Sequence, residues 1–135
     1  MKVWLDTNIL LDVLCDRPEF VEASGNIWKK CEVNNIEGYV SSLSILNIVY
    51  IMRKELTRDK ISDIIRQLST IFTIVDVKAD DIQKAADLPF NDYEDAVQSA
   101  GAFRVKAKYI VTRNVKDFTN SKIPAMKPSE LLERL

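Results

Sequence analysis

The sequence contains no histidine among its 135 residues. That absence excludes a Ser-His-Asp triad, acid–base catalysis by histidine and histidine metal ligands. The two cysteines, Cys15 and Cys31, are too few and too far apart in sequence for a thiolate zinc site. Both lie in helical, partly apolar segments, which predicts buried free thiols in a reducing cytoplasm. Carboxylates are the abundant reactive groups that remain.

Glycine and proline are also scarce, with three and four residues, which excludes collagen-like and low-complexity chains. No apolar stretch is long enough to span a membrane, and a strand that carries Asp6 occupies the place of a signal peptide. We therefore expect a cytoplasmic protein with no membrane contact. Hydrophobic residues make up 47% and charged residues 29% of the chain, which predicts one compact domain over residues 1–135.

The chain also lacks an excess of charge of either sign, since its formal net charge at pH 7 is −1. A protein that grips a duplex through its phosphates alone is usually strongly basic. We therefore expect any contact with nucleic acid to be local, brief, metal-assisted or completed by a partner. The densest basic run, from Arg53 to Lys60, is more typical of a solvated helix surface than of an RNA track.

Short apolar segments alternate with amphipathic ones along the whole chain. The expected strands are residues 2–5, 37–42, 72–77 and 108–112. The expected helices begin at residue 8 and then cover residues 20–33, 43–56, 57–71, 78–88, 91–107 and 128–135. This alternation predicts an α/β fold, a three-layer α/β/α sandwich with a central parallel sheet.

Polar residues follow three of the predicted strands. They are Asp6, Thr7 and Asn8, then Ser41 and Ser42, then Thr112, Arg113 and Asn114. The carboxyl ends of parallel strands meet at one edge of the sheet, where functional sites form. The sequence therefore predicts a site at this edge. For Asp6 the simpler alternative is a helix cap, because aspartate readily accepts hydrogen bonds from free helix N–H groups.

The helix expected over residues 91–107 begins with acids. Asp92 and Asp95 lie on or beside the face that carries a stripe expected to be buried, and this stripe consists of Ala96, Ala100, Phe103 and Ala107. Glu94 is expected to point elsewhere and is assigned the ordinary role of an acid near a helix N-terminus. Two carboxylates that lean toward the core edge are better explained by a hard divalent cation such as Mg²⁺. Such an ion can activate water for attack on a phosphodiester.

Three segments follow one another in the order VWLDTNILLDVL, VSSLSILNIVY and DYEDAVQSAGAFRVKAKYIVTRNVKDF. Together they resemble the PIN domain family, which includes the VapC-type toxins of bacterial toxin–antitoxin pairs. The resemblance runs over essentially the whole chain. It implies a parallel α/β/α fold and a ribonuclease that depends on Mg²⁺ or Mn²⁺, in which acids at the strand edge hold the metal.

The resemblance also implies roles for individual residues. It matches Asp6 to the first acid of the family and Asp95 to the acid of the late helix, so these two are the predicted metal ligands. Asp92 is an additional carboxylate one turn earlier. Arg113 is placed to meet a phosphate. The predicted supporting residues are Thr7, Asn8 and Thr112.

Two positions depart from the family's pattern. Asn47 stands where the family usually has glutamate, and Asn114 stands where many members have aspartate. Amides in place of carboxylates lower the negative charge that attracts a hard cation. Asp117 either supplies the missing charge or only ends the turn. Asn47 has a second interpretation, in which it satisfies buried backbone groups, and we favour a place in the site.

Three functions remain open on the sequence. The favoured one is a metal-dependent endoribonuclease, the toxin of a type II toxin–antitoxin pair. The alternative is a catalytically weakened PIN-fold module that binds RNA or a protein. The third is a receiver-type phospho-acceptor domain, which needs a pair of acids after the first strand where this chain has Asp6 alone. The apolar helices between Leu43 and Ile71 predict a homodimer face or an antitoxin groove.

Overall fold

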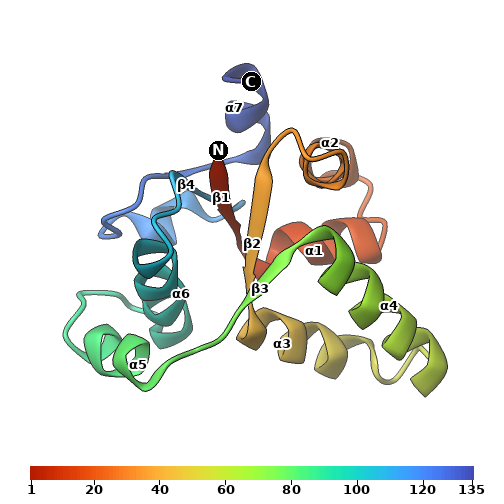
Figure 1. Ribbon diagram of the computed structural model, residues 1–135, viewed down its shortest axis with the longest axis horizontal. Coiled ribbons are helices and arrows are strands. Elements are labelled where there is room, and N and C mark those ends of the chain that lie inside the picture. The colour runs from red at the N-terminus through yellow and green to blue at the C-terminus, as the bar shows by residue number, and fades with distance from the viewer.

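The computed structural model describes all 135 residues, and five parallel strands form its single sheet in the order β3-β2-β1-β4-β5 (Figure 1). The strands are β1 (Lys2–Leu5), β2 (Glu37–Ser41), β3 (Thr73–Val75), β4 (Tyr109–Val111) and β5 (Ala125–Met126). The helices are α1 (Thr7–Leu14), α2 (Val21–Glu32), α3 (Ser42–Met52), α4 (Arg58–Ile71), α5 (Ala79–Ala86), α6 (Tyr93–Arg104), the 3₁₀ helix η1 (Val115–Phe118) and α7 (Pro128–Glu133). The predicted parallel α/β architecture is confirmed.

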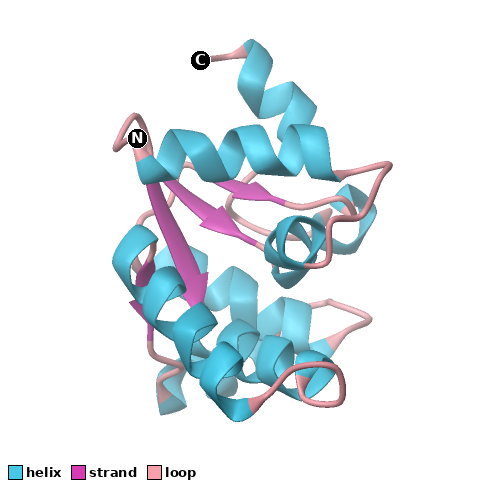
Figure 2. Ribbon diagram, turned by 90° about the vertical axis from the view of Figure 1, so that its right-hand side faces the viewer, coloured by secondary structure: helices cyan, strands magenta, loops and turns pink.

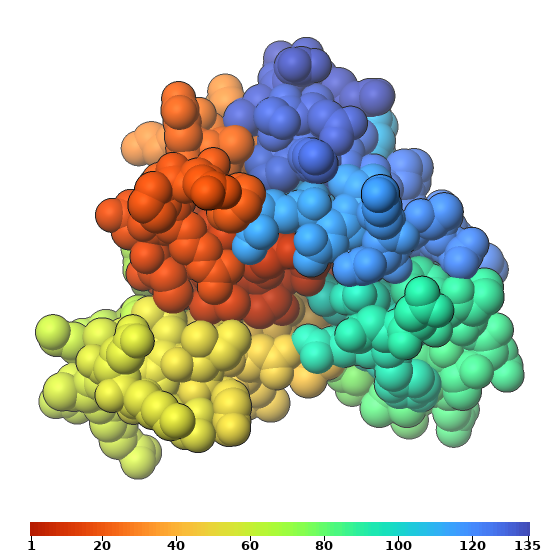
Figure 3. Space-filling model, turned by 180° about the vertical axis from the view of Figure 1, so that it is seen from behind, coloured from red at the N-terminus to blue at the C-terminus, as the bar shows by residue number.

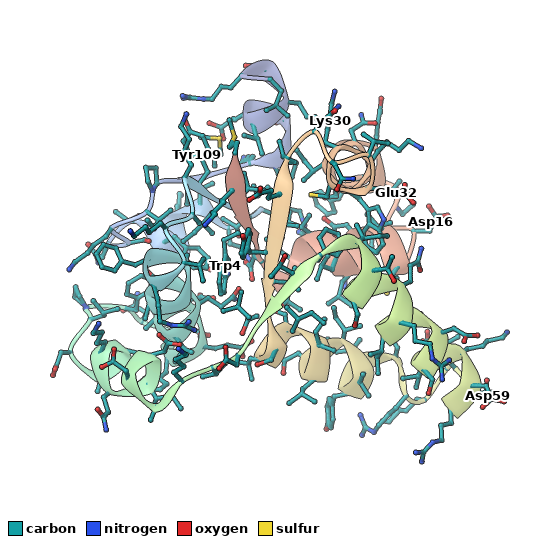
Figure 4. All side chains as sticks on the ribbon, in the orientation of Figure 1. Trp4, Asp16, Lys30, Glu32, Asp59 and Tyr109 are labelled. Atoms are coloured by element: carbon teal, nitrogen blue, oxygen red, sulfur yellow. The ribbon has the colours of Figure 1, made fainter.

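Helices cover both faces of the sheet, as Figures 1 and 2 show. Side chains alternate along β1, so Val3 and Leu5 join the larger core with α1, α2, α3, α4 and α7. Trp4 points to the other face (Figure 4) and packs with α6 and η1. The Trp4 ring lies so close to Gly101 of α6 that a Cβ there would stand 2.7 Å from it. A glycine at position 101 therefore sets the distance between α6 and the sheet.

The order of the strands reverses beside β1. The chain places β2 and β3 on one side of β1, and β4 and β5 on the other. The crevice outside the carboxyl ends of β1 and β4 is therefore the topological switch point, where ligands bind in sheets of this kind. Asp6 directly follows β1 and Thr112 directly follows β4. Ser41, at the end of β2, caps α3 by accepting a hydrogen bond from Leu43 N.

The sequence did not reveal β5. It has two residues and pairs with β4, and Thr112 N extends the pairing by donating to Met126 O at 3.0 Å. Two residues carry no alternation from which a strand can be inferred. Other elements form close to their predicted bounds, although the helix expected over residues 43–56 ends at Met52.

Two expectations about burial were wrong. Cys15 is exposed, because α1 has ended before it, whereas Cys31 is buried as predicted and burial raises the pKa of its thiol to about 12. Phe103 is 49% exposed, whereas the other three residues of the predicted stripe, Ala96, Ala100 and Ala107, are buried as expected. Both cysteines are free. None of the helices is long and apolar enough to span a membrane.

Candidate functional site

Asp6 lies at the switch point, and uncharged donors alone hold its carboxylate. The side chain of Asp6 accepts hydrogen bonds from Thr7 N at 2.8 Å and Gln98 Nε2 at 2.9 Å through Oδ1, and from Thr112 Oγ1 at 2.8 Å through Oδ2. Asp6 is 7% exposed and takes part in no ion pair. The bond from Thr7 N is a helix cap, so the capping geometry and a position at the predicted edge are both present.

A second layer of hydrogen bonds fixes the donors around Asp6. Trp4 Nε1 donates to Gln98 Oε1 at 3.1 Å, and Gln98 in turn donates to Asp6. The hydroxyl of Thr112 accepts from Asn114 N at 3.0 Å while it donates to Asp6. Gln98 was missed by the sequence reasoning. A glutamine inside a helix predicted to face the core was the available signal, and the structure buries Gln98 to 2% exposure.

Thr7 and Asn8 lie on the first turn of α1 beside Asp6. Thr7 Oγ1 donates to Ser44 Oγ at 2.7 Å, which ties α1 to α3. Asn8 Oδ1 is buried and has no hydrogen-bond partner. Since buried polar atoms are almost always paired in folded proteins, this oxygen is an acceptor for which the chain supplies no donor.

Acidic side chains gather near Asp6 from α6 and η1. Asp92 caps α6 by accepting from Asp95 N at 3.1 Å. The pKa of Asp95 is raised from 3.8 to about 7, mainly by burial and then by the negative charges of Asp6, Asp92, Asp117 and Glu94, in that order. A carboxyl group that ionises only near neutral pH marks a place where negative charge has accumulated.

A hydrogen bond joins the side chains of Asn47 and Glu94 across the site. Asn47 Nδ2 on α3 donates to Glu94 Oε1 on α6. Burial and then the charge of Asp92 raise the pKa of Glu94, while the bond from Asn47 acts in the opposite direction. The sequence expectation that Glu94 points elsewhere was therefore wrong. The core interpretation of Asn47 also fails, because its partly exposed side chain joins two helices.

Arg113 is held by a buried ion pair. Its Nε donates to Asp12 Oδ2 at 2.9 Å, and its guanidinium lies 3.9 Å from the centroid of the Phe20 ring. Asp12 is fully buried and also accepts from Ser24 Oγ at 3.0 Å and Arg17 Nη1 at 3.3 Å. Phosphate binding by Arg113 stays a prediction. Its Nε donor is already occupied by Asp12.

Asn114 and Asp117 line two different hollows. Asn114 is exposed, and its side chain makes no hydrogen bond within the chain. It lines a hollow next to Arg113. Asp117 is also exposed and lines a second hollow together with Asp92. Of the two residues, Asp117 is the one whose charge acts on Asp95.

The donor chemistry of this site fits a hard cation. All the acidic groups offer oxygen, and their mutual repulsion would be relieved by a divalent ion. Their spacing is open, because no three acidic or thiol side chains stand close enough together to enclose an ion. Mg²⁺ suits an open arrangement, since one or two carboxylates commonly hold it while it keeps several waters.

Several solved structures share this fold. VapBC2 from Rickettsia felis, bound to a promoter DNA fragment, has a TM-score of 0.71 and 18% identity, covering 94% of this chain and 98% of that chain. DNA-bound VapBC from Salmonella typhimurium has a TM-score of 0.72 and 16% identity, covering 95% of this chain and 98% of that chain. Mycobacterium tuberculosis VapC20, a Sarcin-Ricin loop cleaving toxin, has a TM-score of 0.63 and 16% identity, covering 80% of this chain and 86% of that chain.

Sequence comparison identifies the family. No curated protein matches the chain, but the sequence model of the PIN domain matches residues 2–116. That range includes Asp6, Asn47, Asp95 and Thr112. The receiver-type alternative is therefore wrong, and the resemblance read from the sequence is confirmed. The chain belongs to the PIN domain family.

Proposed function

We propose that this protein is an endoribonuclease that depends on Mg²⁺ or Mn²⁺. The observation that carries the proposal is the gathering of Asp6, Glu94 and Asp95 at the switch point of the sheet, with the charges of Asp92 and Asp117 close enough to act on Asp95. Like charges in a partly buried place raise the free energy of the metal-free site. Membership of the PIN family, and a fold shared with a toxin that cleaves the Sarcin-Ricin loop, support RNA as the substrate.

Asp6 and Asp95 are the residues that would hold the ion. A bound divalent ion supplies a Lewis acid that stabilises charge on a phosphodiester and lowers the pKa of a water. Three hydrogen bonds fix the orientation of Asp6, so its carboxylate needs no rearrangement before it binds. The raised pKa of Asp95, about 7, belongs to the metal-free protein, and a bound cation would lower it because positive charge favours the ionised carboxylate.

Glu94 would supply the charge that the family pattern places at position 47. The amide of Asn47 bonds to the Glu94 carboxylate, so the acid stands on α6 and its neutral partner stands on α3. The two residues together present one negative charge where the family usually has it. The presence of Asn at position 47, where the family usually has Glu, is then compatible with activity.

The decisive experiment is RNA cleavage during titration with Mn²⁺ or Mg²⁺. We expect Asp6→Asn to lower cleavage by at least ~100-fold, because even second-layer changes at metal sites cost 10–100-fold. Asp63→Asn is the matched control, since Asp63 lies exposed on α4 in a surface pair with Arg66. Cleavage that persists in Asp6→Asn, or in wild type with a chelator, would contradict the proposal.

A weakened PIN module is the second candidate. The open spacing of the acids favours it, as do the amides at positions 47 and 114, because both lower affinity for a hard cation. This candidate predicts RNA or protein binding without cleavage at saturating Mn²⁺. The same titration therefore separates the two candidates.

We also propose that the protein is the toxin of a type II pair, acts in the cytoplasm and self-associates. The fold shared with VapBC complexes supports a toxin with an antitoxin partner. Leu46, Tyr50 and Ile51 are 67%, 65% and 49% exposed on α3, and such a patch is costly unless a partner covers it. We assign this face to a second copy of the chain.

Sedimentation tests the dimer. At about 50 μM, within the range of modest specific interfaces, wild type should sediment as a dimer and Leu46→Glu as a monomer. Ile82→Glu on α5 is the control, since Ile82 is an exposed apolar residue on another helix. A monomeric wild type would refute this face as a homodimer interface.

A further inference from the structure

A polar hollow beside the acidic site takes no part in the proposed reaction. It has a volume of about 450 Å³ and lies where the chain enters α2, leaves β4 and enters α7. In Figure 3 these are the orange, light-blue and dark-blue parts that meet above the red N-terminal segment. Six of its lining residues are Glu19, Phe20, Ser24, Arg113, Asn114 and Lys127.

The hollow is directly connected to the acidic site. Thr112 Oγ1 donates to Asp6 Oδ2 and accepts from Asn114 N. The segment that leaves β4 therefore contacts the candidate metal ligand with one residue and lines the hollow with the next two. An RNA strand with its scissile phosphate at Asp6 would pass this hollow with a neighbouring nucleotide.

Arg113 is a preorganised cation in this lining. Its Nε is bonded to Asp12, which is fully buried, and its guanidinium is stacked on Phe20. The two terminal nitrogens, Nη1 and Nη2, make no hydrogen bond within the chain and keep their donors. A guanidinium fork held in this way suits a phosphate, because little rotamer freedom is lost when it binds.

The charge of the hollow contrasts with that of its neighbour. Arg113 and Lys127 contribute two positive charges and Glu19 one negative charge, whereas the acidic site repels the RNA backbone until a cation binds. A chain with a net charge of −1 needs local cations to hold RNA. Ser24 is not available for this purpose, because its hydroxyl donates to Asp12.

We propose that this hollow is a phosphate-binding subsite, in which Arg113 and Lys127 hold the backbone of single-stranded RNA next to the scissile bond. The inference rests on the proposed function for its substrate class. It adds the contact that orients the strand, and it makes Asp12 a positioning residue for Arg113.

RNA binding without metal tests the subsite separately from cleavage. The probe is a fluorescent, 2′-O-methylated single-stranded RNA in chelator, and the readouts are anisotropy and the dependence of affinity on salt. Lys127→Gln should lower affinity at least ~3-fold and reduce the slope of log K against log [salt] by about 0.7, the value for one phosphate contact on a single strand. Arg113→Lys, which keeps a cation for Asp12 but loses the fork, should also lower affinity.

Lys60→Gln is the matched control. It makes the same change of charge at the start of α4, next to Asp59, at the far end of that helix in Figure 4. Thermal melts of all variants report whether the fold is kept. The subsite is supported if Lys127→Gln and Arg113→Lys weaken binding while Lys60→Gln binds as wild type.

Two results would overturn the subsite. One is equal affinity and salt slope in Lys127→Gln, Arg113→Lys and wild type, which would leave the hollow as a protein contact. The other is wild type that does not bind RNA without metal, since the cations of the hollow are present then. Cleavage in Mn²⁺ is measured separately. If the protein does not cleave RNA but its RNA binding depends on Lys127, the nuclease proposal is refuted and the subsite proposal is supported.

Discussion

Asp6 and Asp12 are two buried aspartates at α1 in opposite electrostatic surroundings. Asp12 faces two cations, Arg17 and Arg113, which pair with its carboxylate at 3.3 and 2.9 Å. Asp6 receives hydrogen bonds from neutral groups alone, and its charge raises the pKa of Asp95. One helix thus carries an acid that the chain neutralises and an acid that it leaves charged among other acids.

This difference separates an acid whose charge is balanced within the chain from an acid whose charge is not. Buried charges are usually paired, because an unpaired one raises the free energy of the folded state. The surroundings of Asp12 satisfy that rule within the chain. Those of Asp6 do not, so a cation from solution is the natural complement of Asp6.

The largest expected contrast is in stability without metal. Asp12→Asn should lower the free energy of unfolding by about 2–3 kcal/mol, because it removes the charge that two arginines and a serine hydroxyl contact. Asp6→Asn should cost little or stabilise, since it removes a like charge and its amide can donate to Thr112. Urea unfolding in chelator measures both. A larger loss of unfolding free energy for Asp6→Asn than for Asp12→Asn would contradict the proposed difference between the two aspartates.

A smaller effect is expected when charge is added to the acidic site. Asn47→Glu places a second carboxylate against Glu94, and it should destabilise the metal-free protein by on the order of 1 kcal/mol. The same variant should bind Mn²⁺ more tightly and cleave RNA faster, because a carboxylate adds charge that an amide lacks. Mn²⁺ should therefore restore its stability.

Thermal melts with and without Mn²⁺ provide the measurement for Asn47→Glu. The control is Asn26→Glu, which adds an acid at an exposed position of α2. Equal destabilisation of Asn47→Glu in both conditions would show that position 47 is structural and that the ion binds elsewhere.

A third expected effect is a dependence of stability on pH. Because the pKa of Asp95 is raised from 3.8 to about 7 in the folded protein, the folded state keeps a proton that the unfolded chain has released between these values. The contribution of Asp95 is fully present below pH 3.8 and is lost as pH rises through about 7. Urea unfolding in chelator should show this decline in wild type and a flatter profile in Asp95→Asn. Identical profiles would contradict it.

The fold was predictable because its signals are local. The strand–helix alternation, the apolar runs and the cap at Thr57 are each visible within a few residues, and Thr57 does accept from Lys60 N. The edge of the sheet at which Asp6 and Thr112 meet followed from the parallel topology alone. The strand β5 carried no such signal, since it is defined by pairing and not by pattern.

The site was only partly predictable because its contacts are distant in sequence. Nothing near Asp12 indicates that Arg113 pairs with it, or that Gln98 reaches Asp6. Glu94 was misassigned because an acid in the first turn of a helix has an ordinary explanation, and its bond to Asn47 depends on how α3 and α6 meet. The metal-binding roles of Asp6 and Asp95 stay predictions.

The hydrogen-bonded chain from Trp4 through Gln98 to Asp6 gives the molecule an optical reporter. An indole that donates to the side chain bonded to Asp6 is sensitive to the local field, so arrival of an ion should shift the emission of Trp4. The second tryptophan, Trp28, packs edge-on against Phe72 in the core on the other face of the sheet, and it serves as an internal reference. Occupancy of the site can thus be followed in the unlabelled protein by difference fluorescence.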